Sequence, residues 1–439
     1  MKRIYIVLSL IITSFAIVAA ENPEIERLMQ EGIELHSAGD FESAIEKYHE
    51  VLQINPDFIP AIYEIALSYL AMGEYENAIR YTSKVIYSLD RTLSVGAYAI
   101  QSEALAALDR TDEAIALLER ALEIRGSECL LHFNLALNFY KGHDLENTLM
   151  HVKKAIDLNK SHAEAFLLYA YVLNDLGLWV QSILAFQMFL LFEPDDHRSR
   201  EAFEELLQTM RIVPAGYNED ERLVGQPVPS TENPPLTVEN GVNQFQVYNT
   251  ISAVLSALRE EWEEDYDEEN GMNLEMEYEV DFDDYYDPYY DVENGYIPMQ
   301  ENPLFIEFIE VNREIILLLN DKNNGEEERS GVFWTFYVPF FTRIVESEHY
   351  ETFARYISVS FFPESFEWWQ EHPEEAELFV TWFEEGDESY YYDEYYDYYF
   401  ETDDHEFDEA SVPHNEEELP TTVPLIRPGF FQRITSSFR

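Results

Sequence analysis

The sequence predicts a mainly α-helical protein: a superhelix of paired helices, then a mostly helical, acidic and aromatic-rich domain with a small β element and a low-complexity tail. Two observations favour this fold class. Apolar residues recur at helical spacing through much of the chain, and the first half repeats itself with a period of about 34 residues. The 439 residues leave room for two or three domains with sizeable cores.

Residues 1–20 predict a secretory signal peptide. Lys2 and Arg3 precede a short apolar stretch, and Ala20 lies before a plausible cleavage at Glu21. The alternative is an uncleaved membrane anchor. The single cysteine, Cys129, leaves no partner for an intrachain disulfide, which favours a periplasmic or secreted bacterial protein over a eukaryotic ectodomain. No other stretch is long and apolar enough to span a bilayer, so none is expected in the mature chain.

Five similar units follow one another from residue 25 to residue 196. In each unit a first helix carries a small residue, a turn follows, and a second helix carries another small residue. Small side chains let paired helices approach closely, while large residues fill the gap between adjacent units. The recurring small residues are Gly32, Ala66, Ser102, Ala136 and Ala170 on the first helices, and Ala44, Ala78, Ala114, Thr148 and Ser182 on the second helices.

The turn between the two helices is predicted to contain glycine in three of the units, because helices often end at a residue in the left-handed conformation. These residues are Gly39, Gly73 and Gly177. The third unit has Asp109 instead, and the fourth has Gly142 one position early. Residues 197–211 carry apolar side chains at helical spacing among charges, which is typical of a terminal capping helix.

Period and residue classes together resemble the tetratricopeptide repeat, a helix–turn–helix unit that stacks into a superhelix. The resemblance covers residues 25–211, with five repeats and the capping helix. It implies a concave groove, lined chiefly by the first helices, that binds an extended peptide or a helix of a partner protein. The groove positions carried onto this sequence are Met29, Ile33, His36, Tyr63, Leu67, Leu70, Ala99, Glu103, Phe133, Leu137, Tyr140, Leu167, Tyr171 and Asn174.

These groove positions are mostly apolar, which indicates the kind of partner. Members of the family that grip an acidic C-terminus use Lys, Arg and Asn there, and Lys141 is the only cation nearby. The sequence therefore favours an apolar or amphipathic segment bound through buried area. Two alternatives remain: several of these residues belong to packed cores, or the second half of the chain covers the groove.

Residues 212–241 are rich in Pro, Asn and Gly without periodicity, which indicates a linker at a domain boundary. A mostly helical, acidic domain is predicted at residues 242–386. Its first helix is indicated by apolar residues from Tyr248 to Trp262 at intervals of three and four. Alternation over residues 272–282 predicts a strand after a turn.

Asn302 as cap and Pro303 at the first helical position predict the start of another helix in this domain. Pro339 is expected to kink or end a further helix. Two or three short helices should follow, the last one ending near Gly386. No family is recognised for this domain.

The formal net charge of −60 excludes several function classes. Nucleic acid and anionic lipid surfaces are repelled, and cations or basic proteins are the favoured partners. Residues 21–211 carry 32 acids and 15 bases, whereas residues 212–439 carry 55 acids and 10 bases, so the acidity belongs mainly to the second half.

Residues 387–439 form an acidic tail with a basic C-terminus. Ser389–Glu409 holds seven tyrosines and nine carboxylates, and Asp283–Asp291 is a similar block. Such a segment is either a solvated tail or, with rings that stack on Arg or Lys, a surface that captures a basic partner.

No catalytic layout occurs in the sequence: there is no glycine-rich phosphate loop, no HExxH and no GxSxG. We therefore predict no enzyme activity, no cofactor and no specific metal site. The predicted function is an extracytoplasmic scaffold that binds a protein or peptide, basic partners included, in the repeat groove. The alternative is a structural or cation-buffering envelope component that self-associates through its repeats. The oligomeric state does not follow from the sequence.

Overall fold

The computed structural model describes residues 22–195, 197–212, 242–265, 302–323 and 333–384, and every regular element in these ranges is helical. They form two compact units that divide between Val172 and Leu173. The first unit contains α2 (Pro23–Ser37), α3 (Phe41–Ile54), α4 (Ile59–Ala71), α5 (Tyr75–Val85), α6 (Arg91–Ala107), α7 (Thr111–Arg125), α8 (Cys129–Lys141), α9 (Leu145–Leu158) and most of α10 (Ala163–Asp175). The second contains α11 (Trp179–Phe192), α12 (His197–Thr209), α13 (Gln244–Asp265), α14 (Pro303–Asn323), the π-helical turn η2 (Phe333–Tyr337), α15 (Val338–Val345), α16 (Tyr350–Ile357), α17 (Pro363–Glu371) and α18 (Pro373–Glu384).

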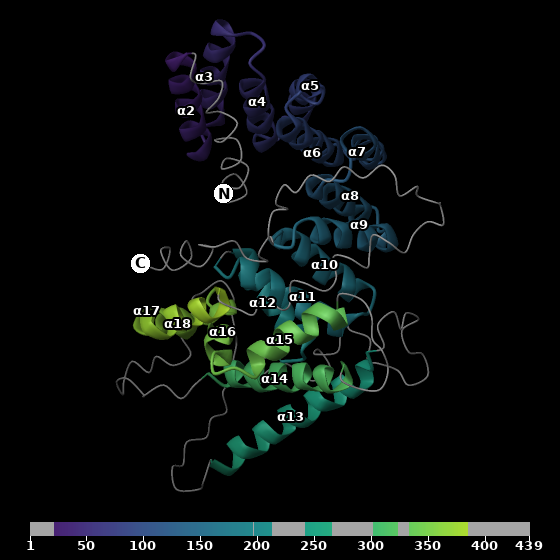
Figure 1. Cartoon of the computed structure of the whole chain (residues 1–439), viewed down its shortest axis with the longest axis vertical. Helices are drawn as coiled ribbons and strands as arrows, with labels where there is room; N and C mark the ends of the chain where they lie inside the picture. The colour runs from purple at the N-terminus through teal and green to yellow at the C-terminus, as the bar shows by residue number, and fades with distance from the viewer. Residues whose placement is uncertain (1–21, 196, 213–241, 266–301, 324–332, 385–439) are drawn as a thin grey trace, which may run out of the picture. The chain divides into compact units, whose positions relative to one another are not determined.

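The helices of the first unit pack as the predicted hairpins (Figure 1). α2 packs against α3, α4 against α5, α6 against α7, and α8 against α9. The second helices α3, α5 and α7 also pack against the first helix of the next hairpin, α4, α6 and α8. The repeat of paired helices expected from the 34-residue period is therefore present.

Side chains fix where several of these helices begin. The Asn22 side chain accepts a hydrogen bond from the Glu24 amide at 3.1 Å, and Asp90 accepts one from the Leu93 amide at 3.0 Å. Such caps satisfy backbone donors that have no partner within the helix. In the second unit Asn302 accepts from the Leu304 amide at 3.0 Å, and α14 starts at Pro303, which confirms that predicted helix start.

The turns follow the predicted pattern in four of the five hairpins. Gly39, Gly73 and Gly177 have φ angles of 83°, 75° and 72°, and Asp109 takes the same left-handed conformation at 59°. The fourth hairpin departs from the pattern, as its early glycine indicated. Gly142 has φ −80°, and His143, one position later, is the left-handed residue at 57°.

Small residues lie where a neighbouring tyrosine leaves no space. A side chain added at Gly32 would overlap the ring of Tyr48 on α3. A Cβ atom added at Gly96 on α6 would lie 2.6 Å from the hydroxyl oxygen of Tyr63 on α4. The close approach of the helices thus depends on glycine opposite a buried ring, within a hairpin at Gly32 and between hairpins at Gly96.

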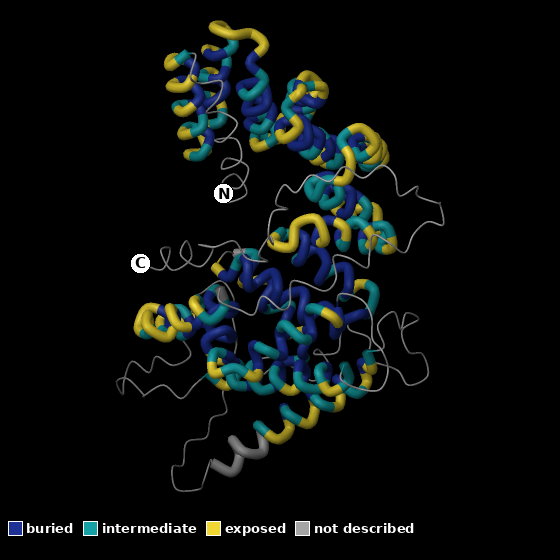
Figure 2. The backbone as a smooth tube through the Cα atoms, in the orientation of Figure 1, coloured by how far each residue is buried: buried dark blue, intermediate teal, exposed yellow. Residues whose placement is uncertain are grey.

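The second unit is organised around α11, the second helix of the fifth hairpin. All fourteen of its residues are buried (Figure 2). Within the unit α12, α13 and α16 pack against it. The two compact units divide inside α10. A helix without a polar face needs covering helices on several sides, so α11 belongs to the same unit as the helices that follow it.

Buried amide side chains join α11 to the C-terminal helices. Gln187 and Asn312 on α14 exchange two hydrogen bonds, at 2.8 and 3.2 Å. Asn312 also donates to the Tyr350 hydroxyl at 3.1 Å, and that hydroxyl donates to the Ile309 carbonyl at 2.7 Å. Tyr356 donates to the Leu191 carbonyl at 3.3 Å. These contacts fix the orientation of α14 and α16 on α11.

The remaining helices of the second unit match the sequence in part. α13 spans the periodic residues Tyr248–Trp262, and three short helices, α16, α17 and α18, precede residue 386. Pro339 lies in the first turn of α15, two residues after the π-helical turn η2 ends at Tyr337. The signal peptide, the strand at 272–282, both tyrosine-acid blocks and the tail at 387–439 lie outside the described residues.

We predict that Gln187→Leu and Asn312→Leu each lower the free energy of unfolding by about 1–3 kcal/mol, because each leaves a buried amide without its partner. The double variant should lose about 1–2 kcal/mol less than the sum of the single variants. Urea unfolding of the full chain measures these differences. The same change at the exposed Asn249 of α13 is the control, with an expected effect within about 0.5 kcal/mol. Additive single effects would contradict the coupling.

Candidate partner-binding site

The face formed by the first helices is the candidate site, since α2 packs against α4, α4 against α6, and α6 against α8. The predicted groove residues differ in their exposure on this face. Met29, His36 and Tyr63 are buried, and Leu137 is 39% exposed. Half-buried positions are Ile33, Leu67, Leu70, Ala99, Phe133, Tyr140, Leu167, Tyr171 and Asn174, and Glu103 is exposed.

The buried residues do not offer a surface to a partner. Met29 has no exposed area and belongs to the core between α2, α3 and α4. His36 contacts Ser68 Oγ through Nδ1 at 2.9 Å and the Phe41 ring edge-on at 4.9 Å. Tyr63 packs against Gly96. Met29, His36 and Tyr63 are therefore core residues, because a neighbouring helix covers each of them. This is one of the two alternatives that the sequence left open for the groove positions.

Asn174 is also not part of the candidate site. It belongs to the second unit, where its Nδ2 atom donates to Thr209 Oγ1 on α12 at 3.2 Å. We define the first-helix face as the accessible positions that remain in the first unit: Ile33, Leu67, Leu70, Ala99, Glu103, Phe133, Leu137, Tyr140, Leu167 and Tyr171.

Lys141, the cation near this face, makes contacts within the chain. Lys141 donates to the Ala106 carbonyl, and its Nζ atom lies 3.6 Å from Asp109 Oδ1. This contact ties the end of α8 to the turn of the preceding hairpin. Lys141 therefore has its charge partly balanced within the chain, which disfavours the binding of a partner's carboxylate here.

Glu64 on α4 is a buried carboxyl that the sequence reasoning missed. It is 2% exposed, and its Oε1 atom has no hydrogen-bond partner. Burial raises the pKa of Glu64 to about 7. Burial, followed by the charge of Glu64, also raises the pKa of Tyr48 and Tyr63. The signal was available in the sequence, since Glu64 is the only charged residue in the segment that forms α4.

We predict that Glu64→Gln stabilises the first unit only at alkaline pH. The pKa of Glu64 is about 7 in the folded state, above the ordinary 4.5. The folded protein therefore has its full stability below pH 4.5, where Glu64 is neutral, and it loses stability as the pH rises through 7 and the buried carboxyl becomes charged. The variant should therefore raise the free energy of unfolding by about 1–3 kcal/mol at pH 8.5 and change it little at pH 5. Chemical denaturation at both pH values measures this. Glu123→Gln on the exposed surface is the control, and equal gains at both pH values would contradict the mechanism.

Two histidines on the fourth hairpin contact each other. His132 Nδ1 lies 2.9 Å from His151 Nδ1, so one ring donates and the other accepts, and Ser127 Oγ lies 3.0 Å from His132 Nε2. Burial, then His151 and Lys154, lowers the pKa of His132 to about 4. Within the described ranges no three His, Cys, Asp or Glu side chains gather as a metal site would require.

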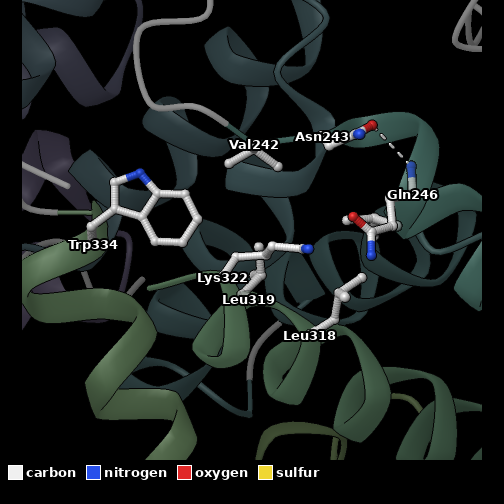
Figure 3. A pocket seen from close by; sticks show the side chains of 8 residues that line it. Val242, Asn243, Gln246, Leu318, Leu319, Lys322 and Trp334 are labelled. Carbon is white, nitrogen blue, oxygen red and sulfur yellow. Dashed lines mark hydrogen bonds between the residues drawn. The ribbon is translucent and has the colours of Figure 1, made fainter. Parts of the chain in front are cut away.

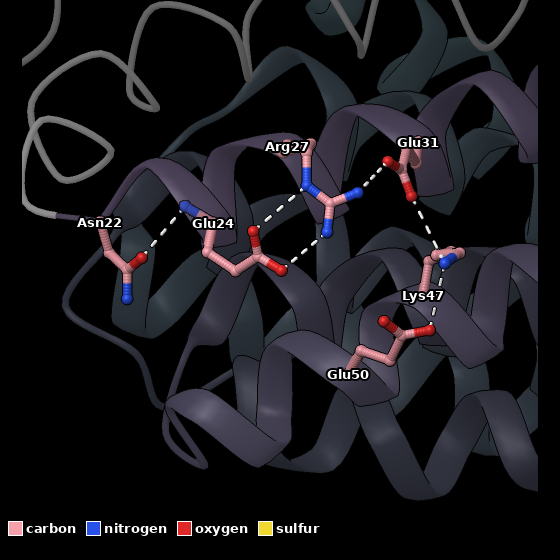
Figure 4. A network of polar contacts seen from close by, with 6 residues as sticks. All are labelled: Asn22, Glu24, Arg27, Glu31, Lys47 and Glu50. Atoms are coloured by element: carbon pink, nitrogen blue, oxygen red, sulfur yellow. Dashed lines mark hydrogen bonds and ion pairs between the residues drawn. The ribbon is translucent and has the colours of Figure 1, made fainter.

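Charged side chains at the start of the array form a surface network (Figure 4). Arg27 lies between Glu24, at 2.7 Å, and Glu31, and Lys47 on α3 lies 3.4 Å from Glu31 and 3.1 Å from Glu50. These side chains are accessible to solvent, where ion pairs add little to stability. The network links α2 to α3 and is not a binding site.

A cavity of about 220 Å³ lies between α13 and α14 in the second unit (Figure 3). Leu318, Leu319 and Trp334 supply its apolar lining, and Lys322 and Gln246 supply polar groups. Pockets that enclose small-molecule ligands usually measure about 300–1,000 Å³. The cavity is smaller than this, and we assign no ligand to it.

The single cysteine is not activated as a nucleophile. Burial, then Glu128 and Glu164, raises the pKa of Cys129 to about 12, which disfavours the reactive thiolate. Among the residues with described structure, no helix has both the length and the apolar character needed to cross a membrane.

Two family models match the repeats, both described as tetratricopeptide repeat, at residues 35–88 and 95–128. No relative among curated proteins matches the sequence. Similar solved structures include TTC0263, a tetratricopeptide-repeat protein of Thermus thermophilus, with 20% identity, 42% of this chain and 98% of that chain covered, and a TM-score of 0.38. PilF of Pseudomonas aeruginosa has 18% identity, coverage of 43% and 85%, and a TM-score of 0.37. MamA of Desulfovibrio magneticus has 16% identity, coverage of 43% and 96%, and a TM-score of 0.30.

The family assignment depends on the matching models together with the helical hairpins, and not on these structural scores. The models span parts of the first three hairpins, and the same pairing of helices continues to α9. The N-terminal half of the chain contains tetratricopeptide repeats.

Proposed function

We propose that this protein is an extracytoplasmic scaffold without enzyme activity, whose first-helix face binds an apolar or amphipathic helix of a partner protein. The supporting observation is the makeup of that face. Ile33, Leu67, Leu70, Leu137 and Tyr140 are half-buried or exposed, so each keeps apolar area that a partner can cover. Covering this area is favourable without any charge pairing.

An amphipathic helix suits this surface better than an extended acidic peptide. The side chains at residues 33, 67 and 137 occupy equivalent positions in three repeats, directly after the small residue of the first helix. They can receive apolar side chains spaced at intervals of three and four along one face of a partner helix. Lys141, which an acidic peptide would need, is paired with Asp109.

The functional test replaces one apolar residue on each face of the same hairpin. Leu137→Lys on α8 should weaken binding of an amphipathic leucine-rich helix about tenfold or more, because it places a charge inside the apolar contact. Met150→Lys on α9 is the matched control, since Met150 is 55% exposed and lies on a second helix. Fluorescence anisotropy with a labelled Leu/Gln helix measures both affinities. Equal loss from the two variants would contradict binding on the first-helix face.

We also propose that the protein is exported and that residues 1–20 are removed. The support is the sequence layout, together with the first helix of the array, which is capped at Asn22 directly after the expected cut. The mass of the protein recovered from the periplasm or medium should correspond to a chain that starts at Glu21. A full-length mass in the membrane fraction would contradict removal.

A structural or cation-buffering envelope component that self-associates through its repeats remains the second candidate, and the net charge of −60 favours it. The two functions differ in their response to a chelator. A scaffold retains its protein partner in the chelator, whereas a buffer takes up many cations weakly and does not saturate early.

A further inference from the structure

The first helices of the hairpins carry few cations. The first helices α2, α4, α6 and α8 contain three Lys and Arg residues, whereas the second helices α3, α5, α7 and α9 contain seven. The first-helix cations are Arg27, Arg91 and Lys141, and the second-helix cations are Lys47, Arg80, Lys84, Arg120, Arg125, Lys153 and Lys154. The second helices also carry ten carboxylates against six on the first helices, so each set has a formal net charge of −3.

Each of the three first-helix cations is paired with a carboxylate of the first unit. Arg27 lies 2.7 Å from Glu24, Arg91 Nε donates to Glu128 at 2.6 Å, and Lys141 lies 3.6 Å from Asp109. The acids of the first helices outnumber these cations: they are Glu24, Glu26, Glu31, Glu34, Glu64 and Glu103. Glu64 is buried, so Glu103 is the one carboxylate of α4, α6 and α8 that lies at the surface.

Glu103 lies on α6, the first helix of the third of the five repeats. It follows Ser102 on α6, and the equivalent residues of the other repeats are Ile33, Leu67, Leu137 and Tyr171. The third repeat thus places an exposed carboxylate in a row that is otherwise apolar. α6 packs against both α4 and α8, so Glu103 lies between the repeats that carry Leu67 and Leu137. Among the described residues no cation pairs with Glu103.

We propose that the partner segment is a cationic amphipathic helix, with a Lys or Arg that pairs with Glu103 while its apolar side chains pack on Leu67 and Leu137. This inference rests on the proposed function of the first-helix face and adds the charge of the partner. A carboxylate flanked by apolar surface is selective, because a neutral or acidic helix would leave it buried without a partner charge. The net charge of −60 on the whole chain also speeds the approach of a basic segment.

The experiment compares charge reversal on the two faces of the third hairpin. Glu103→Lys on α6 and Glu123→Lys on α7 change the net charge of the full chain equally, and both positions are exposed. The probe is a labelled Leu/Lys amphipathic helix of about 18 residues, long enough to span several repeats. At physiological salt, Glu103→Lys should weaken its binding about tenfold or more and Glu103→Gln about threefold, while Glu123→Lys should change it less than twofold.

The outcomes separate this inference from the proposed function. If Glu103→Lys and Glu123→Lys weaken the Leu/Lys helix equally, the general charge attracts it and the pairing with Glu103 is overturned. If the neutral Leu/Gln helix binds as tightly as the Leu/Lys helix and Leu137→Lys weakens both, helix binding stands and the cationic partner is overturned. If neither helix binds to the intact chain, the proposed function itself fails.

Discussion

The burial of α11 is the constraint on which the second unit depends. Its fourteen residues are all buried, and its sequence has no polar face that could lie in water. An isolated repeat array that ended with this helix would expose a continuous apolar surface, which soluble proteins rarely tolerate. The C-terminal helices that pack on α11 are therefore part of the folding of the last repeat.

Polar groups decide how those helices pack, since apolar contact alone has little directionality. Gln187, Asn312 and Tyr350 satisfy one another inside the core, and any shift of α14 along α11 would leave amides buried without partners. A network of this kind contributes less to net stability than to the choice of a single arrangement. The aromatic residues around it, such as Phe203 and Phe308 with ring centroids 5.0 Å apart, supply the buried area.

In the first unit, several cations hold successive hairpins together. Arg125 donates to the carbonyls of Ile86 and Ser88 at 2.8 and 3.1 Å, and thereby joins α7 to the end of the preceding hairpin. Arg91 and Lys141 make equivalent links at the ends of their helices. Because these cations are engaged in the fold, the first helices present apolar and acidic groups outward. The stability of the array and the character of its surface thus have a common origin.

The sequence by itself determined the helices, their pairing and many of the positions where they begin and end. These features depend on local spacing, caps and turn residues such as Asn302 and Gly39. It also predicted an apolar first-helix face. Only the tertiary structure decided which apolar residues stay accessible: Met29 and Tyr63 lie under neighbouring helices, whereas Leu67 and Leu137 do not. It also decided that Glu64 is buried and that the compact units divide inside α10. The physical reason is that helical periodicity identifies the apolar side of a helix, while the burial of each residue depends on which helix packs against that side.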